Sequence, residues 1–182
     1  IKGVNADLIV AMGGGSVLDS AKMISVLLRN PSFLDNLLDA GLIGERGVPL
    51  IAIPTSAGTG SEATPNSIVV VPEQKLKVGV VHPFFIPDCV VLDPEATLSL
   101  PPNITATTGL DAFCHAIECF ISKKRNPFSD LYALEAIRLI SRSLRTACAD
   151  GADTRAREDL LLAAFYGGMC IASSSTVAVH AL

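Results

Sequence analysis

The chain has 182 residues, of which 49% are apolar and 18% are charged, a balance that predicts a packed globular protein and excludes a disordered one. A net charge of −4 without a basic cluster argues against a nucleic-acid partner, because phosphate binding requires a positive surface. No apolar run reaches the roughly 18 residues that cross a bilayer, and the five cysteines form no Cys-x-x-Cys pair. We therefore predict a cytoplasmic protein that has no membrane association.

The first predicted strand leads into a turn suited to phosphate. Residues 7–12 form a short apolar run, as expected of a parallel strand buried on both faces. Residues 13–16 read Gly-Gly-Gly-Ser, and the next predicted element is a helix over about residues 17–28. Backbone N–H groups and the positive end of a helix dipole converge at such a turn. A plain tight turn that needs glycine remains the alternative.

The second predicted strand is followed by a loop rich in hydroxyl groups. Residues 49–54 are apolar between prolines, and residues 55–64 are dense in Ser, Thr and Gly. Ligands of α/β proteins bind at the carboxyl ends of such strands, although an ordinary Ser/Gly loop would read the same way. Residues 67–71 and 76–81 predict a hairpin, and residues 89–93 predict a further buried strand.

Prolines at 94, 101 and 102 end the strand-rich part, and helical periodicity follows. We predict an α/β domain over residues 1–102 and an all-α domain over residues 103–182. The helices are expected at about residues 103–122, with Asn103 as N-cap, at about 126–145, and from about 153 onward. Arginines late in the second of these helices are expected to complement its dipole. The chain begins without Met and stops within a helix-like segment, so we expect a fold that is incomplete at both ends.

The first of these helices carries a candidate metal site. Asp111 and His115 are one turn apart and point the same way, so that a carboxylate and an imidazole can share one divalent cation. A solvated helix face with a charge pair is the commoner explanation of such spacing. The small residues on a neighbouring side, and the absence of Lys or Arg before Lys123, favour the metal site.

Three segments together resemble a known family. Residues 108–118, Thr-Gly-Leu-Asp-Ala-Phe-Cys-His-Ala-Ile-Glu, are similar to the metal-binding helix of the iron-containing (group III) alcohol dehydrogenases. Residues 13–22 resemble the pyrophosphate-binding turn of that family. Residues 55–62 resemble its Thr-Thr-x-Gly-Thr-Gly-Ser-Glu signature, with Ser56 in place of the second Thr. The resemblance implies a dehydroquinate-synthase-like architecture, in which an α/β part precedes an all-α part.

The resemblance also implies site residues. The metal ligands would be Asp111, His115 and His180, and a fourth ligand and a histidine near the substrate are expected beyond Leu182, so no catalytic residue is assigned. Asp19 is expected to cap and orient the turn, and Thr59 and Ser61 are expected to hold the loop in shape. The residues expected to contact the dinucleotide are Gly14, Gly15, Ser16, Thr55, Gly58, Thr64, Asn66 and Lys77.

The function implied by the resemblance is hydride transfer between a small alcohol or aldehyde (or ketone) and NAD or NADP, with a divalent metal activating the alcohol. Fe(II) is the metal implied, with Zn or Mn open, and a homodimer is expected. A glycerol-dehydrogenase-like or dehydroquinate-synthase-like enzyme, a hydroxyacid–oxoacid transhydrogenase and an inactive fragment remain alternatives. We expect the 182-residue chain by itself to be inactive.

Overall fold

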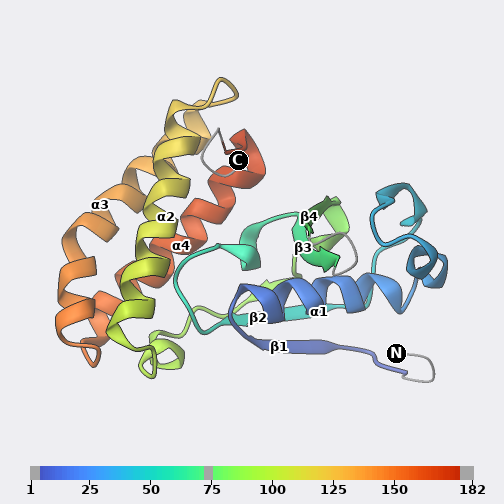
Figure 1. Ribbon diagram of the computed structural model, residues 1–182, viewed down its shortest axis with the longest axis horizontal. Coiled ribbons are helices and arrows are strands. Elements are labelled where there is room, and N and C mark those ends of the chain that lie inside the picture. The colour runs from blue at the N-terminus through green and yellow to red at the C-terminus, as the bar shows by residue number, and fades with distance from the viewer. Residues whose placement is uncertain (1–4, 72–75, 177–182) are drawn as a thin grey trace.

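The computed structural model describes residues 5–71 and 76–176. It consists of an α/β part followed by three long helices (Figure 1). No helix in these described residues is long and apolar enough to cross a membrane.

Three parallel strands form the sheet of the α/β part. They are β1 (Ile9–Gly13), β2 (Leu50–Pro54) and β5 (Cys89–Val90), in the order β1-β2-β5. Ile9 lies opposite Leu50, and Ile51 lies opposite Cys89. Because all three strands run the same way, their carboxyl ends meet at one edge of the sheet.

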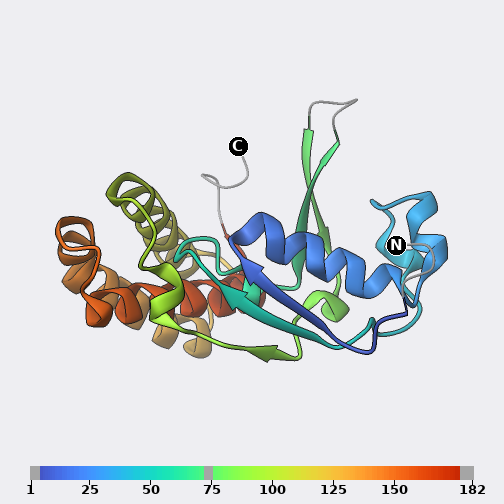
Figure 2. The same ribbon diagram turned by 90° about the horizontal axis from the view of Figure 1, so that it is seen from below.

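The expectation that the first strand is buried on both faces is wrong for the described residues. Helix α1 (Gly15–Leu27) packs on one face, where Ala11 and Ala52 are buried. Val10 and Met12 point the other way, and each is 59% exposed. Figure 2 shows α1 lying along one face of the sheet. Because side chains alternate along a strand, one covering helix buries only every second residue.

A hairpin projects from the sheet region (Figure 2), as the sequence predicted. Strands β3 (Asn66–Val71) and β4 (Leu76–Val81) are antiparallel, and Asn66 lies opposite Val81. The turn between them, residues 72–75, lies outside the described residues. Short 3₁₀ turns connect the longer elements: η1 (Pro31–Asp35), η2 (Ala40–Leu42), η3 (Ser61–Ala63), η5 (Pro83–Phe85) and η6 (Pro94–Thr97).

The helical part contains α2 (Pro102–Ile121), α3 (Pro127–Ala149) and α4 (Thr154–Ser174), which pack on one another (Figure 1). Asn126 caps α3 in a reciprocal capping box with Ser129. The prediction of Asn103 as the N-cap of α2 is wrong: Pro101 holds that position and Pro102 opens the helix, because proline is pre-set for the first helical turn. The domain boundary at residue 102 stays a prediction.

Helix α2 buries its small side chains, whereas its large apolar side chains are exposed or only partly buried. Ala112, Ala116 and Cys119 are at most 1% exposed, whereas Leu110 is 53% and Ile121 is 63% exposed. Small residues let the backbones of α2, α3 and α4 approach closely, which explains why the apparently weaker side of the helix faces the core.

Arg138 and Arg142 of α3 form ion pairs instead of complementing its dipole. The last turn of α3, all of which the structure describes, contains no basic residue. Arg142 Nη2 lies 2.6 Å from Asp159 Oδ1 of α4, and Arg138 pairs with Glu135 on its own helix.

Two glycines join the two parts of the molecule. Gly60 adopts a φ of 61° just before η3, where only glycine is unstrained. A Cβ atom at Gly168 of α4 would overlap the carbonyl oxygen of Gly60. The absence of side chains at both positions therefore lets α4 rest directly on the loop after β2.

Candidate functional site

A cleft of about 560 Å³ lies where the α/β part meets the helices. It brings together residues from both ends of the described chain, from Gly15 of α1 to Thr176 just after α4. Among the residues that line it are seven predicted site residues: Gly15, Ser16, Thr64, Asn66, Lys77, Asp111 and His115.

The glycine turn forms one wall of the cleft. Gly14 is the N-cap of α1, and Gly15 and Ser16 open the helix. A Cβ atom at Gly15 would lie 2.8 Å from Thr59 Oγ1, so glycine is required for the hydroxyl-rich loop to approach this backbone. Like every helix start, this first turn has backbone N–H groups without intrahelical partners, and those groups suit an anion.

The hydroxyl-rich loop is held in shape by the residues expected to do so. The N–H of Ser61 donates to Thr59 Oγ1 at 3.3 Å, and Ser61 Oγ donates to Asp19 Oδ1 at 2.6 Å. Asp19 does not cap α1, because it lies in the second turn of the helix. Its side chain instead accepts the hydrogen bond from Ser61 and so anchors the hydroxyl-rich loop to α1.

Three predicted cofactor residues do not line this cleft. Gly58 packs against α2, since a Cβ there would lie 2.9 Å from Thr108 Cβ. The N–H of Thr55 continues the strand ladder to the carbonyl of Gly13 at 3.0 Å. Gly14 packs against Ser56, because a Cβ added to Gly14 would lie 3.3 Å from Ser56 Oγ. Their contact with a dinucleotide stays a prediction.

The predicted metal ligands of α2 face each other. Asp111 Oδ1 lies 4.0 Å from His115 Nε2, the histidine side chain is buried, and the aspartate side chain is 38% exposed toward the cleft. Two atoms bound to one tetrahedral cation at about 2.0–2.2 Å lie roughly 3.4 Å apart, so a small side-chain rotation would bring both onto a shared metal. A carboxylate and an imidazole thus fit two positions of a divalent cation.

The third predicted metal ligand, His180, lies outside the described residues, so its role as a ligand stays a prediction. Within residues 5–71 and 76–176, no group of three His, Cys, Asp or Glu side chains comes together.

Comparisons with known proteins identify the family of the chain. Residues 1–94 match the family model described as iron-containing alcohol dehydrogenase, and residues 105–182 match the model of the C-terminal part of that family. The chain belongs to the iron-containing alcohol dehydrogenase family.

Individual relatives of this family show how much of the fold is present. The chain is 42% identical over 179 residues to long-chain-alcohol dehydrogenase 1 of Geobacillus thermodenitrificans. This match covers 97% of the chain and 45% of the relative. An alcohol dehydrogenase structure from Oenococcus oeni superposes with a TM-score of 0.92 at 37% identity, over 97% of this chain and 46% of that one. The structure of sulfoacetaldehyde reductase from Bifidobacterium kashiwanohense in complex with NAD+ superposes with a TM-score of 0.91 at 35% identity. The match covers 97% of this chain and 47% of that one. The chain therefore spans less than half the length of these relatives.

Sequence analysis did not single out two buried ionisable residues close to the cleft, Lys22 and Glu62. Lys22 is 1% exposed and Glu62 is 2% exposed. Burial lowers the pKa of Lys22 to about 8, against the opposing effect of Asp19. Burial raises the pKa of Glu62 to about 7, against the opposing effects of its own backbone N–H and of Lys22. A signal existed for Lys22, because Asp19 and Lys22 are the only charged residues of α1.

The sequence reading also missed Thr108, Ile68 and Ile171, which line the cleft. Thr108 lies one turn before Asp111 on the same side of α2. The other two come from β3 and α4, and their apolar character gave no hint of a site.

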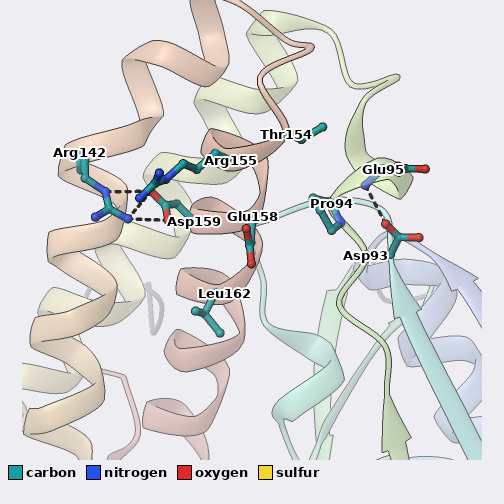
Figure 3. Close-up of a pocket in the computed structure, with 9 residues that line it drawn as sticks. All are labelled: Asp93, Pro94, Glu95, Arg142, Thr154, Arg155, Glu158, Asp159 and Leu162. Carbon is teal, nitrogen blue, oxygen red and sulfur yellow. Dashed lines mark hydrogen bonds and ion pairs between the residues drawn. The ribbon is translucent and has the colours of Figure 1, made fainter.

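A second cavity of about 620 Å³ lies between η6, α3 and α4 (Figure 3). In this cavity Arg142 makes hydrogen bonds of 2.6 to 2.9 Å to Asp159, which also accepts from Ser143. Burial alone would raise the pKa of Asp159, but the hydrogen bonds from Arg142 and Ser143 outweigh it and lower that pKa. No predicted site residue in the described chain lines this cavity, so the smaller cleft is the candidate active site.

Proposed function

We propose that the full-length protein is an NAD(P)-dependent, metal-activated alcohol dehydrogenase that transfers hydride between a small alcohol or aldehyde and a nicotinamide. The observation that carries this proposal is a single cleft that gathers the glycine turn, the hydroxyl-rich loop and the Asp111–His115 pair. Membership of the iron-containing alcohol dehydrogenase family supports it.

The dinucleotide would lie along the α/β wall. The start of α1 offers backbone N–H groups to the pyrophosphate, and Thr64 and Asn66 offer polar groups beside it. Lys77 of β4 is exposed at the cleft and would place a cation near the negative charge of the ligand. The NAD+ complex of the Bifidobacterium relative supports a nicotinamide dinucleotide as the cofactor.

Asp111 and His115 would hold the metal, together with His180. A divalent cation held there, Fe(II) in keeping with the family name and with Zn or Mn as alternatives, would supply a Lewis acid that lowers the pKa of an alcohol. The helix fixes both side chains one turn apart, so this part of the site is formed before any ligand arrives. Both regions border one cleft. This supports the proposal, because hydride transfer requires the cofactor and the substrate side by side.

The metal ligands provide the direct test. In the full-length enzyme, Asp111→Asn and His115→Ala should each reduce bound metal by at least about tenfold and abolish aldehyde-dependent NADH oxidation, with an unchanged far-UV circular dichroism spectrum. Thr107→Ala, an exposed neighbour on α2, is the control and should retain both metal and activity. Stoichiometric metal in either ligand variant by elemental analysis would refute the ligand assignment.

The same assay separates the alternatives. The Thr59-Gly60-Ser61 stretch favours an alcohol dehydrogenase over a glycerol-dehydrogenase-like enzyme. A transhydrogenase would exchange hydride between two substrates without net consumption of added NADH. The isolated 182-residue chain should be inactive with NADH and short aldehydes, and metal-dependent loss of NADH absorbance in that mixture would contradict this.

We further propose a cytoplasmic homodimer. All five cysteines lie among the described residues as free thiols, which supports a reducing compartment. Leu131 and Leu134 of α3 are 65% and 52% exposed, and this apolar surface supports burial in an assembly. Light scattering of the full-length protein and cell fractionation test the two proposals.

A further inference from the structure

Lys22 is an unusual residue in its surroundings. It is 1% exposed in the middle of α1, and lysine is almost never fully buried unless its ammonium group is paired. Its Nζ donates to the carbonyl of Asn66 at 2.8 Å, to the carbonyl of Thr64 at 3.1 Å and to Thr64 Oγ1 at 3.2 Å. Asp19 Oδ1 lies 3.6 Å away. All three donor positions of the ammonium group are thus used.

The groups that Lys22 binds belong to the wall of the cleft. Thr64 and Asn66 line it, whereas Lys22 lies behind them and does not. The helix that carries Lys22 also begins with Gly15 and Ser16, which line the opposite part of the same wall. One buried side chain therefore connects the two backbone segments between which a dinucleotide would lie.

A second residue of α1 makes parallel connections. Ser61 Oγ donates to Asp19 Oδ1 at 2.6 Å, and Ser67 Oγ donates to the Asp19 carbonyl at 2.9 Å. The residues joined are 42 and 48 positions apart in the sequence. Residues 61–66 lie beyond the end of β2, where the hydrogen bonds of the parallel sheet no longer fix the chain. These side-chain contacts fix it instead.

We propose that Lys22 is a positioning residue for dinucleotide binding, which holds Thr64 and Asn66 at a fixed distance from the start of α1. This inference rests on the proposed function, since it concerns how the same cleft accepts its cofactor. Lys22 itself touches no ligand. Losing its ammonium group leaves two buried carbonyls without their donor and frees the loop to move away from the glycine turn.

The charge of Lys22 supports the same role. Burial lowers the pKa of this lysine to about 8, and the nearby carboxylates of Asp19 and Glu62 counteract that effect. At neutral pH the ammonium form therefore predominates and keeps three hydrogens to donate. Charged donors make stronger hydrogen bonds than neutral ones, so the loop is held by strong contacts at the pH of the cell.

The test compares Lys22→Met with a matched variant in the full-length enzyme. Asn30 is 6% exposed just beyond α1, and its side chain makes four hydrogen bonds to residues that do not line the cleft. Asn30→Ala thus removes buried polar contacts of similar number away from the cofactor. Fluorescence titration with NADH should show a Kd raised at least about tenfold in Lys22→Met and changed less than about twofold in Asn30→Ala, at a comparable loss of Tm.

Steady-state kinetics distinguish positioning from general destabilisation. Lys22→Met should raise the KM for NADH while kcat per folded enzyme changes less than about threefold, because the reacting atoms are not affected. A purely structural role would lower the amount of folded enzyme and leave KM at the wild-type value. Equal Kd values in Lys22→Met and Asn30→Ala would overturn the inference.

A milder variant covers the case in which Lys22→Met does not fold. Lys22→Gln keeps a shorter, neutral hydrogen-bond donor at the same buried position. It should raise the Kd for NADH by about threefold, and an unchanged Kd would contradict the inference. If the wild-type enzyme binds neither NADH nor NADPH, the proposed function is wrong. If the wild-type enzyme binds one of them and Lys22→Met binds it equally well, only the positioning role is refuted.

Discussion

The two walls of the cleft are built in different ways. On the α/β side, polar contacts between residues 42 to 48 positions apart hold the hydroxyl-rich loop to α1. On the helical side, Asp111 and His115 are four positions apart on one helix, which packs through alanines that are almost completely buried. The cofactor wall therefore depends on tertiary contacts, whereas the metal wall depends mainly on local helix geometry. We expect the first to be sensitive to single polar substitutions and the second to changes in side-chain volume.

The contact between the walls should give the largest effect. Gly168→Ala would drive a methyl group into the Gly60 carbonyl and toward Ala63 Cβ, 3.0 Å away, so α4 must shift from η3. We expect a loss of about 3 kcal/mol in the free energy of unfolding, measured by urea denaturation of the full-length enzyme.

Gly167→Ala is the matched control for that substitution. A Cβ at Gly167 would meet His115 Cβ at 3.7 Å, an ordinary contact, and alanine favours a helix. Stability should stay the same or rise by up to about 1 kcal/mol. Equal losses in both variants would show that close approach at Gly168 is not what joins the walls.

The buried charges of the cofactor wall should make stability depend on pH. The folded state keeps a proton on Glu62 up to about pH 7, whereas the unfolded chain releases it near 4.5, so stability falls as pH rises through this window. Lys22 acts in the opposite sense: the folded state loses its proton near pH 8 and the unfolded state near 10.5, so stability recovers above pH 8.

Glu62→Gln isolates the acidic part of this dependence. Glu62 Oε1 is buried and has no hydrogen-bond partner among the residues described, so a neutral amide removes a desolvated charge. The decrease in unfolding free energy between pH 5 and 8 should shrink by about 2 kcal/mol in this variant. Glu45→Gln, on an exposed loop, should keep the wild-type slope, and an identical slope in Glu62→Gln would show that Glu62 does not titrate in this range.

A helix cap in the metal wall should give the smallest effect. Asn126 accepts hydrogen bonds from the N–H groups of Phe128 and Ser129 at the start of α3. Asn126→Ala should cost about 1 kcal/mol of unfolding free energy, whereas Asn126→Asp should retain most of it. NADH affinity should not change in either variant, and a weakened affinity would mean that the two walls are more strongly coupled than their contacts suggest.

Sequence reasoning succeeded where a local pattern decided the structure. The strands, the hairpin and the long helices follow from apolar periodicity and turn residues, and the pairing of Asp111 with His115 follows from helical spacing. It failed at Asn103, where Pro101 and Pro102 fix the helix start, and at the exposed face of β1. It also failed to identify Lys22, because burial depends on what packs around a residue.

By itself, the sequence determined the order of elements, the family and which residue types are available for phosphate and metal binding. These properties depend on spacing along the chain, which the backbone converts directly into helix faces and strand ends. Only the tertiary structure decided that five of the eight predicted cofactor residues line one cleft with Asp111 and His115, and that a buried lysine stands behind them. Those outcomes depend on distant segments that meet through Gly60, Gly168 and the hydrogen bonds of α1, and a linear pattern does not encode such meetings.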